Sequence, residues 1–465
     1  MTSSERCIAV VGGGITGLAA AHRLRTSSSA RVVLIEPADR LGGKLRTERV
    51  DGFVVDSGPE ALAPGRPDAA KLAEELGVEM VTSAPGGPGA VKVGRRLREM
   101  PDGIGGFIPR KIKPLATTRL FSPLGKVRMA FETVAPVRRD DADESLESFT
   151  SRRLGKQAYE RLVEPVASGI FCGDPARLSL LATMPHLRRA ELEHGGLVRA
   201  VLAERRAAKQ EKRAGAPPRR PGMASPTTGM GGIVDAVVAR LEADDAVEIR
   251  LGTAAVGLER DGGRYRVELS DGTAVMADGV ILAAPTAASA AVLDRLGAHE
   301  AAALLSAMEV ASTATVSLGF RADGMPDLDA LLPAHGYLIA GPGRGPVCGV
   351  TRSSSKFPGR APEGHELFRV TVRAPDSTPS DELLELARAE LAATLGIRSE
   401  PVLSLVQRWN GVMPQYAVGH LERVAELEKA LQPWPGVVVA GSGTHGLGIP
   451  DCVASAERAA AALAG

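Results

Sequence analysis

Cysteine is scarce in this chain, which has four cysteines among 465 residues. Cys7, Cys172, Cys348 and Cys452 lie far apart, and no CxxC pair or paired histidine accompanies them. Neither a disulfide framework nor a zinc site is therefore supported. The scattered thiols favour a reducing compartment, so we expect a cytoplasmic protein with no bound metal.

The chain also lacks an excess of charge of either sign and any long apolar run. Lys and Arg total 56 and Asp and Glu total 55, so the net charge of +1 gives no reason to expect nucleic acid as a partner. No run reaches the roughly 18 uncharged apolar residues of a membrane-spanning helix. The apolar stretch at 8–21 contains three consecutive glycines and has no basic leader or cleavage site, so it is not a signal peptide. Any membrane contact would be peripheral.

What the chain does have, close to its start, is one half of a dinucleotide site. An apolar run at 8–11 meets three glycines of a GxGxxG pattern, an Ala-rich helical stretch follows, and a second apolar run at 31–35 ends at Glu36. The glycines are Gly12, Gly14 and Gly17. They let the backbone turn tightly beside a pyrophosphate, and the helix amino terminus offers N–H donors to it. Glu36 can accept from ribose hydroxyls, which favours FAD or NAD over NADP.

A second glycine-rich motif follows the acid. Glu36 continues into an ExxxRxGGK pattern that contains Arg40, Gly43 and Lys44. This pattern resembles the FAD superfamily of amine oxidases, phytoene desaturases and protoporphyrinogen oxidases. In that superfamily the second loop also serves the flavin.

The length of the chain exceeds a single ordinary core, so two or three domains are expected. We expect an α/β fold, α+β overall, in which a discontinuous Rossmann-like nucleotide-binding domain is combined with a mixed-sheet substrate-binding domain and an inserted helical lobe. The predicted segments are 1–85, 222–287 and 434–465 for the nucleotide-binding domain, 96–206 for the helical lobe, 207–221 for a basic connector, and 86–95 with 288–433 for the substrate-binding domain.

Local patterns after the connector predict further elements. AspGly and GlyGly pairs near 262 and 272 indicate hairpin turns, so we expect a three-stranded meander followed by a final parallel strand. The predicted strands are 247–251, 263–270, 273–276 and 279–283. One helix is expected at 294–308.

The carboxyl-terminal segment supplies a further nucleotide-like unit. A strand at 437–440 leads into a glycine-rich loop at 441–448, and Pro450 occupies a plausible first turn of an Ala-rich helix. A helix beginning at Ile449 or Pro450 would direct its positive end at a ligand. Beside a flavin ring it would favour the negative charge that develops on reduction.

Three long motifs identify a narrower family. Residues 169–179, 409–424 and 446–453 resemble, in order, the helical-lobe motif, the segment before the last flavin strand and the flavin-capping end of the protoporphyrinogen and coproporphyrinogen III oxidases. The resemblance implies an FAD enzyme of haem biosynthesis that oxidises a porphyrinogen to a porphyrin with molecular oxygen and releases hydrogen peroxide. Hydride would pass from a meso carbon to flavin N5, in three rounds. The residues themselves suggest no general base.

The resemblance also assigns site residues by motif. On the cofactor side these are Gly12, Gly14, Ile15, Thr16, Gly17, Glu36, Arg40, Gly43, Lys44, Gly58, Pro59, Glu60, Ala61, Val256, Trp409, Gly441, Gly448, Ile449, Pro450 and Asp451. On the substrate side they are Gly169, Ile170 and Leu338. Composition alone would read Ile170 and Leu338 as ordinary core residues, and Trp409 as a packing residue.

One segment departs from the family pattern. Many members carry a basic or polar residue, often followed by an aromatic one, before the strand at 90–97, whereas this chain has Gly89 there and Lys92 in place of the aromatic. Recognition of a substrate carboxylate is then rearranged, with Lys92, Arg95 and Arg96 as candidates. Exposed hairpin cations are the simpler reading of those three residues.

The resemblance implies that the substrate is coproporphyrinogen III or protoporphyrinogen IX. The sequences GlyProGluAlaLeu at 58–62 and GlyIleProAspCys at 448–452 look more like the bacterial branch that acts on coproporphyrinogen III. The branch acting on protoporphyrinogen IX more often has Asn or Arg after GlyPro, and Asn before Asp. Coproporphyrinogen III is therefore favoured. A monomer and a homodimer both stay open, as does a haem-pathway enzyme as partner.

Two other classes of function stay open. The first is another flavin amine oxidase or desaturase. An amine oxidase would need an aromatic cage beside the flavin, but the chain has only four Tyr and two Trp. A non-catalytic binding protein of the GDP-dissociation-inhibitor kind would be expected to have lost its flavin contacts, whereas Glu36 and the glycines are intact. A yellow purified protein would exclude the second class.

Overall fold

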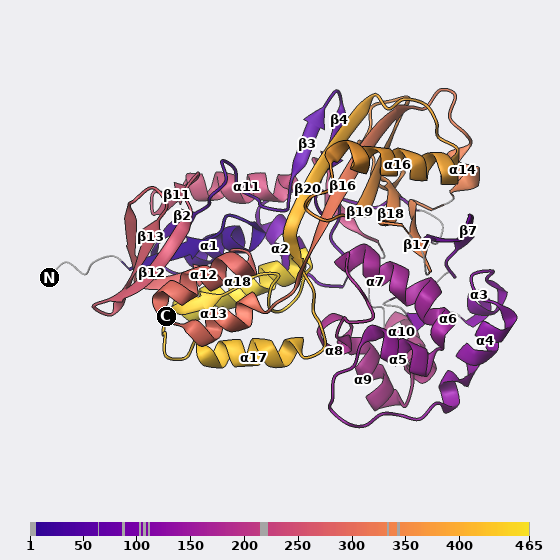
Figure 1. The fold of residues 1–465 in the computed structure, drawn as a ribbon, viewed down its shortest axis with the longest axis horizontal. Helices are drawn as coiled ribbons and strands as arrows, with labels where there is room; N and C mark the ends of the chain where they lie inside the picture. The colour runs from indigo at the N-terminus through magenta and orange to yellow at the C-terminus, as the bar shows by residue number, and fades with distance from the viewer. Residues whose placement is uncertain are drawn as a thin grey trace.

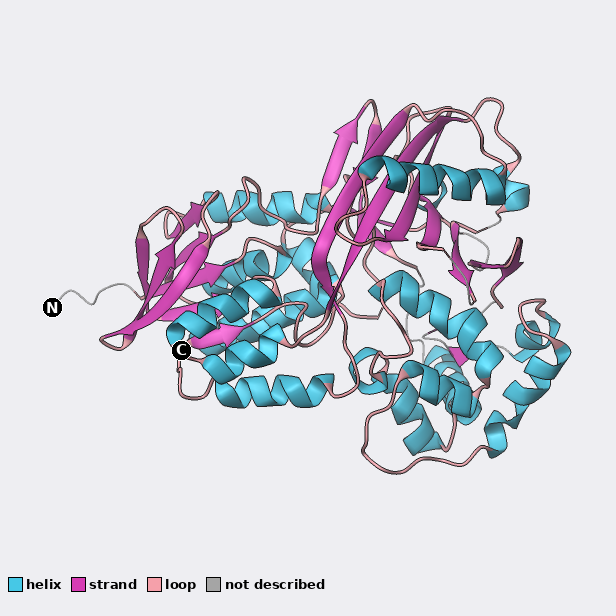
Figure 2. Cartoon of the chain, in the orientation of Figure 1, coloured by secondary structure: helices cyan, strands magenta, loops and turns pink. Residues whose placement is uncertain are grey.

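The computed structural model describes residues 6–63, 65–85, 89–101, 104–105, 108–109, 112–213, 222–332, 334–341 and 345–464. Figure 1 shows three regions: a parallel sheet with its helices at the left, a larger sheet at the upper right and a helical lobe at the lower right. The described residues nearest to the two ends of the chain lie at the left, and Figure 2 shows that the lobe is almost entirely helical. Among the described helices, none combines the length and the apolar character needed to cross a bilayer.

The parallel sheet has five strands in the order β11-β2-β1-β15-β21. All four strand pairings are parallel. Every residue of β1 and β15 is buried, as expected of central strands covered on both faces. The strands are β1 (Cys7–Val11), β2 (Arg31–Ile35), β11 (Val247–Arg250), β15 (Gly279–Leu282) and β21 (Val437–Val439).

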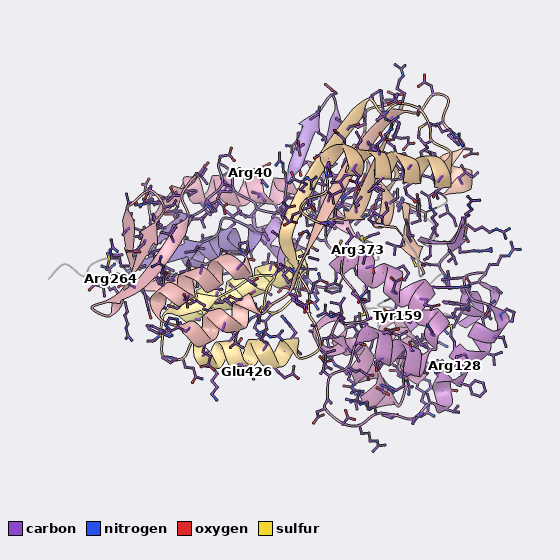
Figure 3. The ribbon with its side chains drawn as sticks, viewed as in Figure 1. Arg40, Arg128, Tyr159, Arg264, Arg373 and Glu426 are labelled. Atoms are coloured by element: carbon purple, nitrogen blue, oxygen red, sulfur yellow. The ribbon has the colours of Figure 1, made fainter. Side chains whose placement is uncertain are left out.

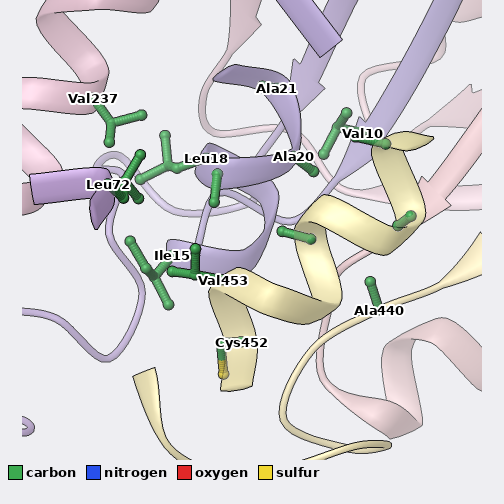
Figure 4. Packing of buried hydrophobic residues seen from close by; sticks show 14 of the residues in the cluster. Val10, Ile15, Leu18, Ala20, Ala21, Leu72, Val237, Ala440, Cys452 and Val453 are labelled. Atoms are coloured by element: carbon green, nitrogen blue, oxygen red, sulfur yellow. The ribbon is translucent and has the colours of Figure 1, made fainter. Parts of the chain in front are cut away.

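Helices from both ends of the chain cover one face of this sheet. Leu18 and Ala21 of the first helix and Val453 of the last helix belong to one buried cluster, whose packing is shown in Figure 4. Small alanine side chains let these helices approach closely, so sequence ends far apart share a core. The helices are α1 (Ile15–Ser27), α2 (Asp68–Glu75), α11 (Gly231–Glu242) and α18 (Ile449–Ala464).

The opposite face carries a three-stranded antiparallel meander and three more helices. Val280 of the parallel sheet, Val267 of the meander, Leu293 and Leu427 belong to one buried cluster. The elements are β12 (Ala255–Asp261), β13 (Arg264–Leu269), β14 (Ala274–Ala277), α12 (Thr286–Leu296), α13 (His299–Ser306) and α17 (His420–Ala430).

The larger sheet has seven strands in the order β20-β16-β19-β18-β17-β6-β7. It is antiparallel except for the parallel pairing of β17 with β6. Helix α16 (Ser380–Leu395) packs on one face, where its Leu383 and Leu391 are fully buried. The strands are β6 (Ala90–Val93), β7 (Arg96–Glu99), β16 (Val310–Arg321), β17 (Gly336–Ala340), β18 (Val347–Arg352), β19 (His365–Arg373) and β20 (Leu403–Pro414).

The helical lobe contains buried ion pairs as well as an apolar core. Arg153 and Glu132 form a pair with both side chains 0% exposed, and Arg188 lies 2.9 Å from Glu191. Tyr159 and Arg128 mark this lobe in Figure 3. Its helices are α3 (Ile112–Thr117), α4 (Pro123–Ala130), α5 (Leu146–Arg153), α6 (Lys156–Ala158), α7 (Glu164–Phe171), α8 (Leu180–Thr183), α9 (Pro185–His194) and α10 (Leu197–Arg213).

Several short elements link these regions. They include the hairpin of β3 (Thr47–Val50) with β4 (Phe53–Asp56), the pairs β5 (Met80–Thr82) with β10 (Ala224–Pro226) and β8 (Ile104–Gly105) with β9 (Ile108–Pro109), and the helices α14 (Leu328–Leu331) and α15 (Ser353–Lys356). The hairpin β3–β4 places the 57–60 segment between the parallel sheet and the seven-stranded sheet, because Arg369 of β19 bonds to Gly58.

The meander differs from its prediction in one strand. The strand predicted at 247–251 is not its first strand: β11 joins the edge of the parallel sheet beside β2, and β12 takes its place. The turns are as predicted, since Gly262 and Gly263 connect β12 to β13. A short strand of alternating apolar and charged residues, as in Val247–Arg250, fits either sheet, and only the pairing partner distinguishes them.

Helix and boundary predictions also differ at particular points. The single helix predicted at 294–308 is two helices, because Gly297 has φ 88° and ends α12. Helices α12, α13 and α17 pack with the parallel sheet, although 288–433 was predicted to be substrate-binding domain. Strand β7 pairs with β6, so the seven-stranded sheet continues past residue 96, where the lobe was predicted to begin. The connector predicted at 207–221 is helical to Arg213, and 214–221 lie outside the described residues.

Candidate functional site

The carboxyl ends of the parallel strands surround the first cavity, of about 430 Å³. It is lined by the turn after β1, the acid after β2, the alanines after β15 and the glycine-rich loop after β21. Ligands of open parallel sheets bind at this edge, because neighbouring loops diverge there. Strand β20 closes the cavity from the other side with Trp409 and Val412.

The three glycines of the first turn have different geometry. A Cβ on Gly17 would lie 1.8 Å from the carbonyl oxygen of Gly12, so only glycine lets α1 start against this turn. Gly12 has φ +108°, and a Cβ there would meet the carbonyl oxygen of Ala283 at 2.7 Å. Gly14 lines the cavity, and a Cβ on it would meet nothing within 4 Å. The cavity is therefore open at Gly14, and the backbone is closely packed at the other two.

Glu36 stands at the end of β2 and lines the first cavity. Its Oε2 accepts a hydrogen bond from the Gly13 backbone N–H at 2.6 Å, and its Oε1 accepts from Ala38 N–H at 3.0 Å. These two bonds fix the carboxylate beside the glycine turn. Its remaining lone pairs can accept from ligand hydroxyls.

Lys44 is a buried cation in the wall of the first cavity. Its Nζ donates to the carbonyl oxygen of Val412 at 3.0 Å and to Ser442 Oγ at 3.2 Å. Burial lowers the pKa of Lys44, and no carboxylate of the described residues forms an ion pair with it. An anionic ligand group beside Lys44 would relieve this cost.

The glycine-rich loop at 441–448 is held by two aromatic side chains. The Tyr416 hydroxyl donates to the Ser442 carbonyl oxygen at 2.6 Å and accepts from the Gly446 N–H at 3.0 Å. The His420 ring stacks on Tyr416 with centroids 4.0 Å apart, and its Nε2 lies 2.8 Å from the Thr444 carbonyl oxygen. Sequence reasoning quoted the 409–424 motif but gave these two residues no role.

The predicted cofactor residues divide into two groups. Those that line the first cavity are Gly12, Gly14, Ile15, Thr16, Glu36, Arg40, Gly43, Lys44, Pro59, Trp409, Gly441 and Ile449. Those that do not line it are Gly17, Gly58, Glu60, Ala61, Val256, Gly448, Pro450 and Asp451. The structure adds lining residues that sequence reasoning missed, among them Val11, Ala254, Ala283, Ala284 and Cys452. The alanines at 283–284 end a parallel strand, which is the signal that could have found them.

Some predicted cofactor residues that do not line the first cavity have a structural role. Asp451 accepts from the Gly448 N–H at 3.1 Å and pairs with Arg66, so it holds the turn before α18. A Cβ on Gly58 would lie 1.8 Å from the Lys44 carbonyl oxygen, so this glycine lets two segments pass closely. Val256 is 47% exposed beside the lining residue Ala255.

A second cavity, of about 320 Å³, lies between helix α7 and the seven-stranded sheet. Gly169 of α7 and Leu338 of β17 both line it, and a Cβ on Gly169 would meet the Leu338 side chain at 2.9 Å. Ile170 does not line it and is 49% exposed. The polar residues that line it are Ser83, His335, Tyr337, Thr351, Lys356, Arg369 and Thr371.

The segment 57–60, called the shared wall below, lies between residues of the two cavities: Pro59 lines the first, and Arg369 and Lys356, which line the second, bond to Gly58 and Glu60. Pro59 lines the first cavity, and the Trp409 Nε1 donates to the Ser57 carbonyl oxygen at 3.0 Å. On the other side, Arg369 Nη2 donates to the Gly58 carbonyl oxygen at 2.7 Å, and Lys356 Nζ lies 3.0 Å from Glu60 Oε2. Groups bound in the two cavities would therefore be neighbours.

The three cations predicted from the sequence to bind a substrate carboxylate do not line the second cavity. Lys92 donates to both carboxylate oxygens of Glu390, at 2.7 and 2.8 Å, and is 15% exposed. Lys92, Arg95 and Arg96 are not among the described residues that line the second cavity. An internal ion pair explains Lys92, so the cations that face this cavity are Lys356 and Arg369.

Comparison with known proteins agrees with this geometry. The family model of flavin-containing amine oxidoreductases matches residues 15–464. The chain is 39% identical to a coproporphyrinogen III oxidase of Propionibacterium freudenreichii subsp. freudenreichii, over 97% of this chain and 90% of that protein. It is 32% identical to a coproporphyrinogen III oxidase of Bacillus subtilis, over 99% and 98% of the two chains.

A solved structure has the same fold. The crystal structure of an Exiguobacterium sp. 255-15 protein, provisionally assigned as a protoporphyrinogen oxidase, superposes with a TM-score of 0.85 at 28% identity and covers 100% of this chain and 99% of its own. The crystal structure of a reduced UDP-galactopyranose mutase shares the fold at a TM-score of 0.71 and 16% identity. The fold is that of FAD-dependent oxidoreductases.

FAD is the cofactor of this protein, and the residues of the first cavity fit it. The open position at Gly14 leaves room for a pyrophosphate at the start of α1, and the fixed carboxylate of Glu36 suits a ribose without a phosphate. The buried Lys44 ammonium suits an anionic group. The chain is an FAD-dependent oxidoreductase that belongs to the flavin-containing amine oxidoreductase family and, within it, to the protoporphyrinogen and coproporphyrinogen III oxidases.

Proposed function

We propose that this protein oxidises a porphyrinogen to a porphyrin in haem biosynthesis, with molecular oxygen as the electron acceptor and hydrogen peroxide as the second product. The observation that carries the proposal is the shared wall at 57–60, which places a second cavity next to the cofactor cavity. When bound, FAD accepts two electrons in each of three rounds, and the protein supplies orientation and charge.

Different residues of the first cavity would bind different parts of FAD. Gly14 and the amino terminus of α1 would hold the pyrophosphate, and Glu36 the ribose. Lys44 lies against Val412 and Ser442, which supports a role at the flavin end, although its motif suggested the adenosine end. There it would stabilise negative charge on reduction, together with the start of α18 at Ile449.

Within the second cavity, Gly169 and Leu338 would contact the macrocycle. The absence of a side chain at Gly169 keeps α7 close to Leu338 and leaves an apolar patch on the cavity wall. Ile170 is not among the residues that line the cavity, so we propose no direct contact for it.

Coproporphyrinogen III is the substrate we favour. Relatives that are named coproporphyrinogen III oxidase reach 39% and 32% identity over nearly the whole chain. A plant relative that is named protoporphyrinogen oxidase reaches 27%. Coproporphyrinogen III carries two more carboxylates than protoporphyrinogen IX, and cations face the second cavity, which supports the same choice.

The test is the growth of porphyrin fluorescence in flavin-loaded protein supplied with each porphyrinogen in air. We expect faster oxidation of coproporphyrinogen III than of protoporphyrinogen IX, with hydrogen peroxide released in proportion. A faster rate with protoporphyrinogen IX would reverse the substrate preference. Inactivity of the yellow protein on both porphyrinogens would contradict the proposed function and favour another amine oxidase or desaturase activity.

A row of exposed apolar side chains on the helical lobe supports peripheral membrane contact by a cytoplasmic protein. Leu124, Val127, Phe131 and Val134 are 82%, 55%, 58% and 73% exposed. Their spacing of three or four residues along α4 and the turn that follows places them on one face, while Met129 points inward. Contiguous exposed apolar side chains of this kind mark interaction surfaces.

Cosedimentation with vesicles of phosphatidylcholine and phosphatidylglycerol tests this contact. We expect the wild type to bind and a Leu124→Ser, Val127→Ser double variant to lose most of that binding. The matched control is Leu331→Ser, which removes an exposed leucine on α14. Sedimentation velocity in the same buffer distinguishes a monomer from a homodimer. A homodimer that the double variant abolishes, without vesicle binding by the wild type, would assign the face to self-association.

A further inference from the structure

The side of the seven-stranded sheet that faces the second cavity carries polar side chains beside the apolar Leu338. In β19 the side chains of Phe368 and Val370 are buried in the core beneath α16, whereas Arg369 and Thr371 line the cavity. Strand side chains alternate between faces, so the same strand closes the apolar core and presents a guanidinium to the cavity. Lys356 reaches the same cavity from the end of α15.

The described residues that line the second cavity include a lysine and an arginine, Lys356 and Arg369, and no carboxylate. Glu60 lies behind the wall, with a side chain 5% exposed, and pairs with Lys356 at 3.0 Å. Burial alone would raise the pKa of Glu60, but Lys356 and Arg369 outweigh it and hold the pKa below its ordinary value. One internal negative charge thus faces two positive charges.

Arg369 has donors to spare. Its Nη2 donates to the Gly58 carbonyl oxygen at 2.7 Å, and its Nε is buried without a hydrogen-bond partner. The Lys356 ammonium has three donors, of which one contacts Glu60. A guanidinium carries five N–H donors, and the bond of Arg369 to Gly58 uses one of them. Neither cation is therefore saturated by the protein.

We propose that Lys356 and Arg369 form a subsite that binds one carboxylate of the substrate. This inference rests on the proposed function and deepens it by naming residues that recognise an acidic side chain of the porphyrinogen. Glu60 and the bound carboxylate together neutralise the two cations. A dianionic phosphate would leave an excess negative charge, so a carboxylate is the group that balances the site.

The subsite would also fix the macrocycle relative to the cofactor. Arg369 bonds to Gly58 and Lys356 to Glu60, and Pro59 between them lines the first cavity. A carboxylate held by these cations is thus tied to the wall of the cofactor cavity. Lys356 and Arg369 are positioning residues here, because their charge orients the substrate and does not take part in electron transfer.

Binding of the product provides a direct test. Flavin-loaded protein is titrated with coproporphyrin III and, in the same detergent buffer, with its tetramethyl ester, which has the same ring without the charges. For Lys356→Gln and Arg369→Gln we expect coproporphyrin III to bind about tenfold to a hundredfold more weakly, with binding of the ester unchanged. For coproporphyrinogen III oxidation, KM should rise more than kcat falls.

Three further variants keep the test specific. Lys356→Arg should restore most of the affinity because it restores the charge. Glu60→Gln should bind coproporphyrin III more tightly than the wild type, because it removes the internal anion that competes for both cations. Arg373→Gln is the matched control: Arg373, labelled in Figure 3, lies on the same strand and face as Arg369 but does not line the second cavity.

The outcomes separate this subsite from the proposed function. Equal loss of acid and ester binding in Lys356→Gln, or no change relative to Arg373→Gln, would overturn the subsite while the wild type still oxidised porphyrinogen. Weaker binding of coproporphyrin III by Glu60→Gln would show that Glu60, Lys356 and Arg369 only stabilise the fold, and it would also overturn the subsite. A flavin-loaded wild type that neither binds coproporphyrin III nor oxidises any porphyrinogen would overturn the proposed function together with the subsite.

Discussion

The indole Nε1 of Trp409 donates a hydrogen bond to the carbonyl oxygen of Ser57 at 3.0 Å, joining two residues 352 positions apart in the chain. Trp409 belongs to β20 of the seven-stranded sheet, and Ser57 follows β4. A Cβ on Gly58 would lie 3.6 Å from the Trp409 ring, so the indole also packs on the shared wall. This contact sets the position of the wall between the two cavities.

Replacing Trp409 by Phe keeps an aromatic ring and removes the donor. The Ser57 carbonyl oxygen then loses a bond of about 1 kcal/mol, and we expect the FAD dissociation constant to rise about fivefold. Titration of apo-protein with FAD, followed by flavin fluorescence, measures it. Trp434→Phe is the control, because Trp434 packs beside Gly297 away from both cavities. Equal FAD affinity in the two variants would contradict this role.

The glycine turn predicts two different defects from one added methyl group. Gly17→Ala forces a Cβ to within 1.8 Å of the Gly12 carbonyl oxygen, so the free energy of unfolding should fall by several kcal/mol even without FAD. Gly14→Ala meets no atom within 4 Å, so the apo-protein should unfold as the wild type does. Its methyl group enters the cavity, and FAD should bind more weakly.

Denaturant unfolding of the two apo-proteins, together with FAD titration, measures both effects. Loss of apo stability in Gly14→Ala, or normal stability in Gly17→Ala, would contradict the assigned geometry of the turn.

Lys44→Met should raise the stability of the apo-protein and, with FAD bound, change the flavin reduction potential. Because burial lowers the pKa of Lys44, the folded apo-protein holds this proton less tightly than the unfolded chain. Its stability is therefore reduced at neutral pH and recovers as the pH rises toward the ordinary lysine value. The variant should unfold at a higher temperature than the wild type at pH 7, and the difference should shrink as the pH increases.

With FAD bound, Lys44→Met should shift the flavin reduction potential to more negative values, because reduced flavin loses a neighbouring cation. Thermal unfolding across pH and a redox titration measure the two effects. Lys429→Met removes an exposed lysine in the last turn of α17 and serves as control. An unchanged potential with Lys44→Met would show that Lys44 does not lie at the flavin end.

The sequence was sufficient where a local pattern has one physical outcome. The turn from Gly12 to Gly17, the acid at Glu36 and helix α18 from Ile449 follow from close packing, strand ends and helix starts, and the structure has them at the predicted places. Strand β11 was harder, because a four-residue strand that alternates apolar and charged residues pairs equally well in a meander or at a sheet edge. Gly297 was visible in the sequence, but its left-handed conformation was needed to end α12.

The second cavity shows what the sequence could not supply. Lys356 and Arg369 lie 13 positions apart and belong to no motif, and they converge only because α15 and β19 flank the same wall. Lys92 was the more obvious cation by position, yet Glu390 neutralises it. Charge at a site depends on which partners the fold has already supplied, and a linear pattern does not contain that information.

The account depends most directly on electron transfer from a porphyrinogen to the bound flavin. Anaerobic mixing of the flavin-loaded protein with coproporphyrinogen III should bleach the visible flavin absorption band in a single turnover, and admission of oxygen should restore the band and produce hydrogen peroxide. Flavin that stays oxidised with coproporphyrinogen III and with protoporphyrinogen IX, while chemical reductants bleach it, would contradict the account.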